Sequence, residues 1–240
     1  MNVKEIRVHG VTFTGVYDTI EDAPHNRQPY GDHRDSGRPC EHTTQKMINV
    51  VQSIAKENIT VVDFGGGNGK MYSTLKQQTD KSFDYMIVDL PNVNSGLGEE
   101  VTHHISLNEI KRPVDIVYTD ATIYAIETPV VENIKNICSL GAEYIVLNRT
   151  MLFFHEAKTL NSDFKKKSFY TWVPKQNNYY NILKLSECEK HFESAGYEIT
   201  HRTFTQRMDD APPRLVFKLA GREIDDPVIT YFDHVLRKRS

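Results

Sequence analysis

The chain has 240 residues, a formal net charge of -3 and three cysteines. No stretch reaches the roughly 18 uninterrupted apolar residues of a membrane-spanning helix, and the charged beginning MNVKEIRVHG lacks the apolar core of a signal peptide. The slightly negative charge argues against nucleic-acid binding, which favours a basic surplus. Cys40, Cys138 and Cys188 are widely spaced, which predicts neither disulfides nor a zinc site. We therefore expect a soluble, cytoplasmic protein without a bound metal.

Residues 1–42 are mostly polar and irregular, with many His, Arg, Gly and Pro residues. They hold too few apolar residues to build a core of their own. We interpret this segment as an N-terminal arm or lid, with Tyr30 as the residue that closes over a bound cofactor. A mobile tail is the alternative interpretation.

From residue 43 onward the pattern becomes regular and alternates between strand and helix. Apolar residues at helical spacing predict helices over 43–58, 70–78, 130–140 and 186–196. Runs rich in β-branched residues predict strands over 59–64, 83–90, 101–106, 114–121, 143–148, 197–204 and 214–221. This order predicts an α/β fold, a doubly wound and mostly parallel seven-stranded sheet with helices on both faces. The loop before the last strand is too short for a crossover helix, so that strand should be antiparallel.

The domain 43–240 carries two further predicted features. An aromatic-rich insertion runs from about residue 149 to 184, between the fifth strand and the following helix. The chain ends with DPVITYFDHVLRKRS, in which Asp226 and Pro227 resemble a helix start and basic residues follow at the end. We therefore predict a C-terminal helix.

The strongest local motif is VVDFGGGNGKM, where a buried strand ends at Asp63 and four glycines follow. Glycine lets the backbone turn tightly and approach a ligand, and the next helix begins directly after the loop. A dinucleotide site has the spacing G-x-G-x-x-G, but its third glycine is replaced here by Lys70. A carboxylate at Asp63 would also repel a pyrophosphate, whereas it suits a ligand with cationic groups.

This motif resembles the first motif of class I S-adenosylmethionine-dependent methyltransferases. The resemblance covers roughly residues 45–220, and Asp89, 26 residues after Asp63, lies where that family places the acid that binds the ribose hydroxyls. It implies that S-adenosylmethionine is the cofactor, that Asp63 places its methionine end and that Leu90 covers the adenine. The cofactor site that we predict consists of Asp63, Gly65, Gly66, Gly67, Asn68, Gly69, Asp89, Leu90, Thr119 and Tyr30.

Residues after the fourth and fifth strands are candidates for acceptor chemistry, because ligands bind beyond the carboxyl ends of parallel strands. His155 is the first candidate for the base, since imidazole titrates near neutrality. Asp120 is the second. Asp120 is followed by Ala-Thr-Ile rather than by two prolines, which disfavours amino methylation of nucleic acids. Trp172 and Tyr124 are the predicted substrate-binding residues, with packing in the core as the alternative for the aromatic residues.

The loop DFGGGNG, the segment FYTWVPKQNNYYNILKLSECEKHFESAGYEI and the N-terminal YDTIEDA are also similar to a group of methyltransferases encoded among surface-polysaccharide genes. That similarity implies a saccharide or nucleotide-sugar hydroxyl as the methyl acceptor. Two alternatives stay open, a nicotinamide-dependent reductase and a non-catalytic scaffold module of the same fold. The sequence does not determine the oligomeric state, and a homodimer is one option.

Overall fold

The computed structural model describes residues 6–8, 11–22, 41–91, 98–126, 128–154, 167–173, 178–205, 214–219 and 222–239. Its α-helices are α1 (Glu41–Ser53), α2 (Lys70–Gln78), α3 (Val130–Ser139) and α4 (Leu185–Ser194). Its strands are β1 (Ile6–Val8), β2 (Val11–Tyr17), β3 (Asn58–Phe64), β4 (Ser82–Val88), β5 (Thr102–His104), β6 (Ile116–Asp120), β7 (Tyr144–Phe154), β8 (Ser168–Val173), β9 (Asn178–Lys184), β10 (Tyr197–Thr205), β11 (Arg214–Leu219) and β12 (Arg222–Lys238).

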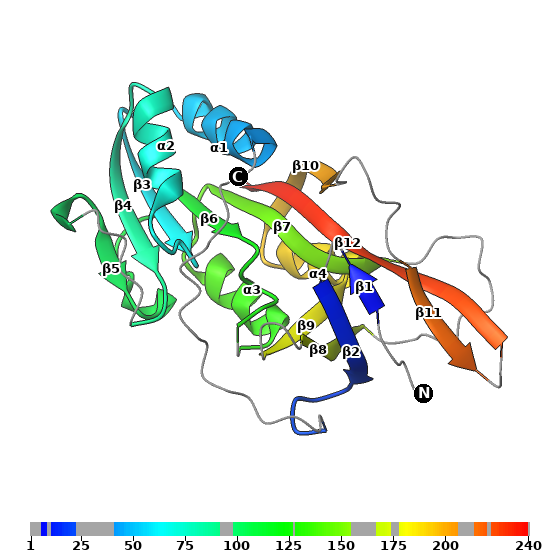
Figure 1. Ribbon diagram of the computed structural model, residues 1–240. Helices are drawn as coiled ribbons and strands as arrows, with labels where there is room; N and C mark the ends of the chain where they lie inside the picture. Colours follow the sequence, from blue (N-terminus) through cyan, green and yellow to red (C-terminus); the bar gives the residue numbers. More distant parts are fainter. Residues whose placement is uncertain are drawn as a thin grey trace.

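Five parallel strands form the centre of the sheet, in the order β5-β4-β3-β6-β7. Next to β7 lies β12, which pairs antiparallel with both β7 and β10. Along the outer part of β7 the sheet continues through β9, β8, β2 and β1. The predicted α/β sheet, mostly parallel with an antiparallel last strand, is therefore confirmed, although it has more than the seven predicted strands (Figure 1).

Helices cover both faces of the central sheet because successive strand residues point to opposite sides. On β3, Ile59 and Val61 pack in one apolar cluster with α1 and α2. Val62, the residue after Val61, points to the other face and packs in a second apolar cluster with α3 and α4. Figure 1 shows α1 and α2 side by side. The strands read as continuous apolar runs in the sequence since both faces are buried.

The predicted C-terminal helix is wrong, because residues 222–238 form the long strand β12. Ile229, Phe232 and Leu236 are fully buried, and polar residues between them are buried as well. Such burial on both faces is typical of a central strand, and its β-branched and aromatic residues fit that environment. Pro227 is typical of the first position of a helix, but here it lies where the pairing of β12 with β11 is irregular. Proline lacks a backbone N–H, and an irregularity in the pairing accommodates that loss.

The predicted N-terminal arm and the predicted insertion both contribute strands to the sheet. Within the predicted arm 1–42, β2 pairs antiparallel with β8. The predicted insertion begins as a continuation of β7 and goes on to form the antiparallel pair β8 and β9. The added strands join the sheet at Leu152 and Phe153 of β7, past the residues of β7 that pair with β6.

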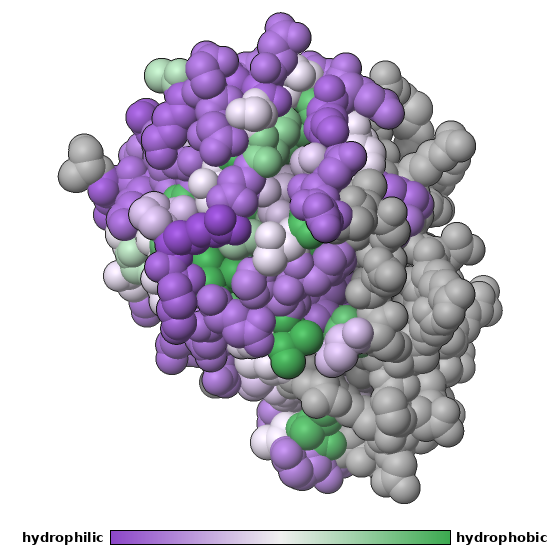
Figure 2. Space-filling model, turned by 90° about the vertical axis from the view of Figure 1, so that its left-hand side faces the viewer, coloured by the Kyte–Doolittle hydropathy of each residue, from purple (hydrophilic) through white to green (hydrophobic). Residues whose placement is uncertain are grey.

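The face that carries β4, β5 and α2 is mostly hydrophilic (Figure 2). Among the described residues, Leu90 and Ile105 are the large hydrophobic side chains that are exposed, at 44% and 64%. No helix in the described ranges is long and apolar enough to cross a membrane.

Candidate functional site

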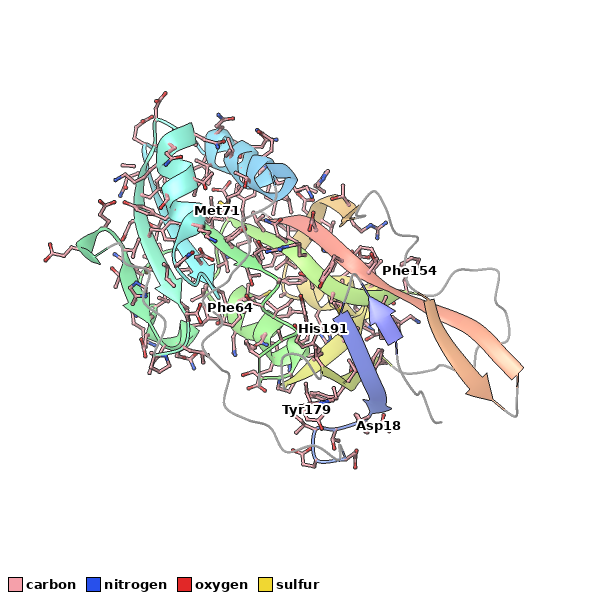
Figure 3. The ribbon with its side chains drawn as sticks, in the orientation of Figure 1. Asp18, Phe64, Met71, Phe154, Tyr179 and His191 are labelled. Carbon is pink, nitrogen blue, oxygen red and sulfur yellow. The ribbon has the colours of Figure 1, made fainter. Side chains whose placement is uncertain are left out.

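The glycine loop connects the end of β3 to the start of α2, as the sequence predicts. Gly65, Gly67 and Gly69 have φ values of 78°, 53° and 71°, a left-handed region that other residues rarely adopt. The backbone N–H of Gly65 donates to the carbonyl of Val88, which joins the loop to the end of β4. Phe64 and Met71 mark the two ends of the loop in Figure 3. The tight turn places several backbone amides at the carboxyl edge of the sheet.

Two glycines are also required by packing. A Cβ on Gly66 would lie 2.7 Å from the carboxyl carbon of Asp63. A Cβ on Gly65 would lie 2.1 Å from Oγ1 of Thr122, in the segment after β6. The loop is therefore pressed between the Asp63 side chain and the carboxyl end of β6, which brings the predicted cofactor and acceptor regions together.

Asp89 follows β4 directly and is partly buried. Its Oδ2 accepts a hydrogen bond of 2.8 Å from the backbone N–H of Gly67. Its Oδ1 accepts one of 2.7 Å from the N–H of Leu90. Each carboxylate oxygen can accept more than one hydrogen bond, so two hydroxyl donors can still bind. The carboxylate also holds the glycine loop, a structural role that sequence reasoning did not anticipate.

Asp63 lies beneath the loop with only 2% of its surface exposed. The hydroxyl of Tyr85 on β4 donates to its Oδ2 at 2.7 Å. Burial raises the pKa of Asp63 to about 7, the Tyr85 hydrogen bond opposes this, and the charges of Asp120 and Asp89 add to the rise. A carboxyl that titrates near neutrality is able to respond to a cationic ligand.

Two buried polar atoms close to the loop have no hydrogen-bond partner in the part of the chain that the structure describes. These are Oδ1 of Asn68, within the loop, and Oγ1 of Thr119, on β6. Thr119 pairs in register with Phe64, so it lies beside the end of β3. Buried polar atoms usually have partners, so both atoms fit a site that is completed by a polar ligand.

Asp120, the second candidate base, forms a bidentate ion pair with Arg149. Nε and Nη2 of Arg149 donate to Oδ1 and Oδ2 of Asp120 at 2.6 and 2.7 Å. Both carboxylate oxygens therefore already accept strong, charge-assisted hydrogen bonds. Arg149 was not among the residues predicted from the sequence. The available signal was its position, directly after the predicted fifth strand.

The predicted substrate-binding aromatic residues lie in packed surroundings. Tyr124 is 2% exposed, and its ring centroid lies 4.9 Å from that of Tyr180. Trp172 on β8 is 6% exposed and packs on Tyr179, with ring centroids 4.8 Å apart. Figure 3 labels Tyr179 on the β8 and β9 side of the sheet. Their roles in substrate binding stay predictions.

The other candidate base, His155, and the predicted lid residue Tyr30 both lie outside the described residues. Their roles also stay predictions. In the described part, the structure brings together Asp63, the glycine loop, Asp89, Thr119 and Asp120 at one edge of the sheet, which is the edge predicted from the sequence.

The sequence matches no protein-family model and no curated protein. Solved structures nevertheless share its fold. A 1,6-didemethyltoxoflavin-N1-methyltransferase from Burkholderia thailandensis, with bound 1,6-didemethyltoxoflavin and S-adenosylhomocysteine, is 15% identical. It matches with a TM-score of 0.60 over 99% of this chain and 100% of its own. The N-terminal domain of EvdMO1 with SAH bound is 12% identical, with a TM-score of 0.55 over 90% of this chain and 91% of its own.

At these identities the similarity concerns the fold alone. The match to the Burkholderia thailandensis methyltransferase extends over nearly the whole chain, including the terminal segments that we expected to be an arm and a helix. The described part of the chain therefore shares its fold with solved methyltransferases. The protein has a methyltransferase fold.

Proposed function

We propose that this protein is an S-adenosylmethionine-dependent methyltransferase. The observation that carries the proposal is the glycine loop held between two carboxylates, one buried beneath it and one bound to its backbone. Asp63 supplies the first carboxylate and Asp89 the second. Two solved structures of the same fold contain S-adenosylhomocysteine.

The described residues fit this cofactor. Asp89 has the remaining acceptor capacity for two vicinal ribose hydroxyls, and the exposed Leu90 beside it is available to cover an adenine. Asp63 would face the cationic methionine end. The unpaired oxygens of Asn68 and Thr119 would find donors on the ligand. Lys70 at the position of the third dinucleotide glycine, together with the buried Asp63, disfavours a nicotinamide cofactor.

The bound cofactor would supply an electrophilic methyl group. The protein then has to align the acceptor with it and to remove a proton from the acceptor. His155 is the proposed base, since the oxygens of Asp120 are held by Arg149. The proposed acceptor is a saccharide or nucleotide-sugar hydroxyl, on the resemblance to methyltransferases of surface-polysaccharide genes. The Burkholderia thailandensis neighbour is an N1-methyltransferase, so the fold by itself leaves the acceptor atom open.

Calorimetry with three ligands tests the cofactor assignment. We expect S-adenosylmethionine and S-adenosylhomocysteine to bind and NAD not to bind. Asp89→Asn serves as a matched variant, because it keeps the size of the side chain and should weaken both adenosyl ligands. Binding of NAD without S-adenosylhomocysteine would instead favour the reductase alternative.

The non-catalytic scaffold alternative makes a different prediction. A scaffold would bind S-adenosylmethionine weakly or not at all and would transfer no methyl group. Incubation with methyl-labelled cofactor and a panel of nucleotide sugars tests this directly. His155→Ala should lower the turnover of an accepted sugar by roughly 10²–10⁴-fold. Unchanged turnover would remove His155 from the mechanism.

A further inference from the structure

Arg149 owes its position to a bulge between β7 and β12. Thr150 pairs with Phe232, whereas Leu147 pairs with His234, so two residues of β7 lie opposite the single residue Asp233. Arg149 itself has a φ of 46°, a left-handed conformation that is strained for a residue with a side chain. Bulges of this kind redirect side chains near functional sites.

The bulge is held in place by buried charge. The backbone N–H of Arg149 donates to Oδ1 of Asp233 at 2.7 Å. Asp233 is 1% exposed, and its Oδ2 accepts from the ammonium of Lys46 on α1 at 2.6 Å. Strained backbone persists only where the surrounding structure fixes it. The conformation of Arg149 is therefore imposed by a buried ion pair that connects α1 with β12.

The consequence is a guanidinium group presented at the edge of the candidate site. Asn148 on β7 pairs in register with Asp120 on β6, so their side chains lie on the same face of the sheet. In a regular strand the side chain of residue 149 would point to the opposite face, away from Asp120. In the bulge, Nε and Nη2 of Arg149 donate hydrogen bonds to Asp120, which fix the orientation of the guanidinium. Nη1 makes no hydrogen bond to any residue that the structure describes, and the Arg149 side chain is 30% exposed.

The surroundings strengthen a hydrogen bond from this group. The hydroxyl-bearing rings of Tyr118 and Tyr124 are almost fully buried. Burial raises the pKa of both tyrosines, and the positive charge of Arg149 opposes that rise in each. The charge therefore acts through a poorly hydrated region, where a charge-assisted hydrogen bond is stronger than in water.

The distance to the proposed cofactor suits a small acceptor. Arg149 follows the parallel part of β7, which is two strands from β3 and its glycine loop. Neighbouring strands lie about 4.8 Å apart, so the separation is on the order of 10 Å. A molecule of the size of a sugar ring can place one group at the loop and another at Arg149.

We infer that Arg149 determines acceptor specificity by binding an oxyanion of the acceptor, a carboxylate or a phosphate, through Nη1. Asp120 and Asp233 act as positioning residues for this contact. The inference rests on the proposed methyltransferase function and narrows the acceptor to an acidic molecule. An acidic saccharide and a nucleotide sugar both meet that requirement.

Anion titration of the protein, first saturated with S-adenosylhomocysteine, tests the inference. The probes are inorganic phosphate and sodium acetate at constant ionic strength, since screening would otherwise change with concentration. We expect at least one of them to bind to the wild type. Its affinity should fall by about tenfold or more in Arg149→Lys, because the single ammonium is taken by Asp120. Comparison of the two probes distinguishes a phosphate from a carboxylate acceptor.

Arg149→Met removes the charge entirely, but it leaves Asp120 unpaired and can reduce stability. Arg149→Lys keeps the charge pair, so a thermal midpoint near that of the wild type shows that the fold is retained. Arg202→Lys is the matched control, because Arg202 also pairs with a carboxylate, Glu189, at 2.7 Å. It should leave anion affinity unchanged.

Equal anion affinity in wild type and Arg149→Lys would overturn the inference, as would the absence of anion binding by the wild type. A failure of S-adenosylhomocysteine to bind would overturn the proposed function instead. In that case the same titration of the ligand-free protein still compares Arg149→Lys with Arg202→Lys, and it tests the anion site separately.

Discussion

Replacing Asp63 with Asn should remove most of the pH dependence of S-adenosylmethionine binding. Asp63 is buried, and its pKa is raised to about 7, chiefly by burial. A cationic ligand favours the ionised form of this carboxyl. The protein must therefore lose a proton from Asp63 when it binds the ligand near neutral pH. Asparagine has a similar shape and cannot ionise.

The size of the effect follows from the fraction of ionised carboxyl. With a pKa of about 7, Asp63 is ionised in roughly 10% of molecules at a pH of about 6 and in roughly 90% at about 8. The apparent affinity scales with the fraction of protein in the competent form. Wild type should therefore bind S-adenosylmethionine roughly tenfold more weakly at the lower pH.

Calorimetry at both pH values measures this ratio, and the same titrations of Asp63→Asn correct for ionisation of the ligand itself. Repeating them in buffers of different ionisation enthalpy detects the released proton. The variant should show a much smaller ratio, with weaker binding at the higher pH. Equal affinity of wild type at both values, or an unchanged ratio in Asp63→Asn, would refute the argument.

The same carboxyl has a consequence for stability. Its pKa in the folded protein lies above its ordinary value of 3.8, so the folded protein binds this proton more tightly than the unfolded chain. The stabilising contribution is fully present below about 3.8 and is lost as the pH rises to about 7. Urea unfolding across this range should show a smaller pH dependence for Asp63→Asn than for wild type.

Three further substitutions give distinct expectations. Asp89→Ala should raise the Kd for S-adenosylhomocysteine by roughly 10- to 100-fold, which corresponds to the loss of about one charged hydrogen bond. The substitution should also lower the thermal midpoint, because the N–H of Gly67 loses its acceptor. An unchanged affinity would contradict ribose binding by Asp89. Trp172→Ala should cost about 3–5 kcal/mol in urea unfolding, since the ring is buried; a raised acceptor KM without loss of stability would instead support the substrate-binding role. Lys46→Met should cost about 3–5 kcal/mol, because Asp233 would be left buried without its partner; unfolding within error of wild type would show that the ion pair does not stabilise the bulge.

Much of the cofactor half of the site could be predicted from the sequence, because its signals are local. The strand β3, the glycine loop and the start of α2 follow one another directly in the sequence. Their conformations depend on turn geometry and on the apolar run before them. Asp89 was predicted from the methyltransferase resemblance, and the structure places it directly after β4. The parallel order was predictable from the alternation of strands and helices.

The rest depends on residues that are distant in sequence. The segment DPVITYFDHVLRKRS carries local helix signals, yet it lies in β12, whose residues 229–236 are mostly buried between β7 and β10. Trp172 shows the same limit, since its burial is decided by β2 and β9 on either side of β8.

The acceptor half of the site is where tertiary structure matters most. No pattern near residue 149 indicates that Asp233 will bind its backbone, that Lys46 will neutralise Asp233, or that the resulting bulge will turn Arg149 toward Asp120. Sequence alone determined the chemistry of the loop, since backbone turns are encoded locally. Only the tertiary structure determined which charges meet across the sheet, because strand pairing joins segments that are far apart in the chain.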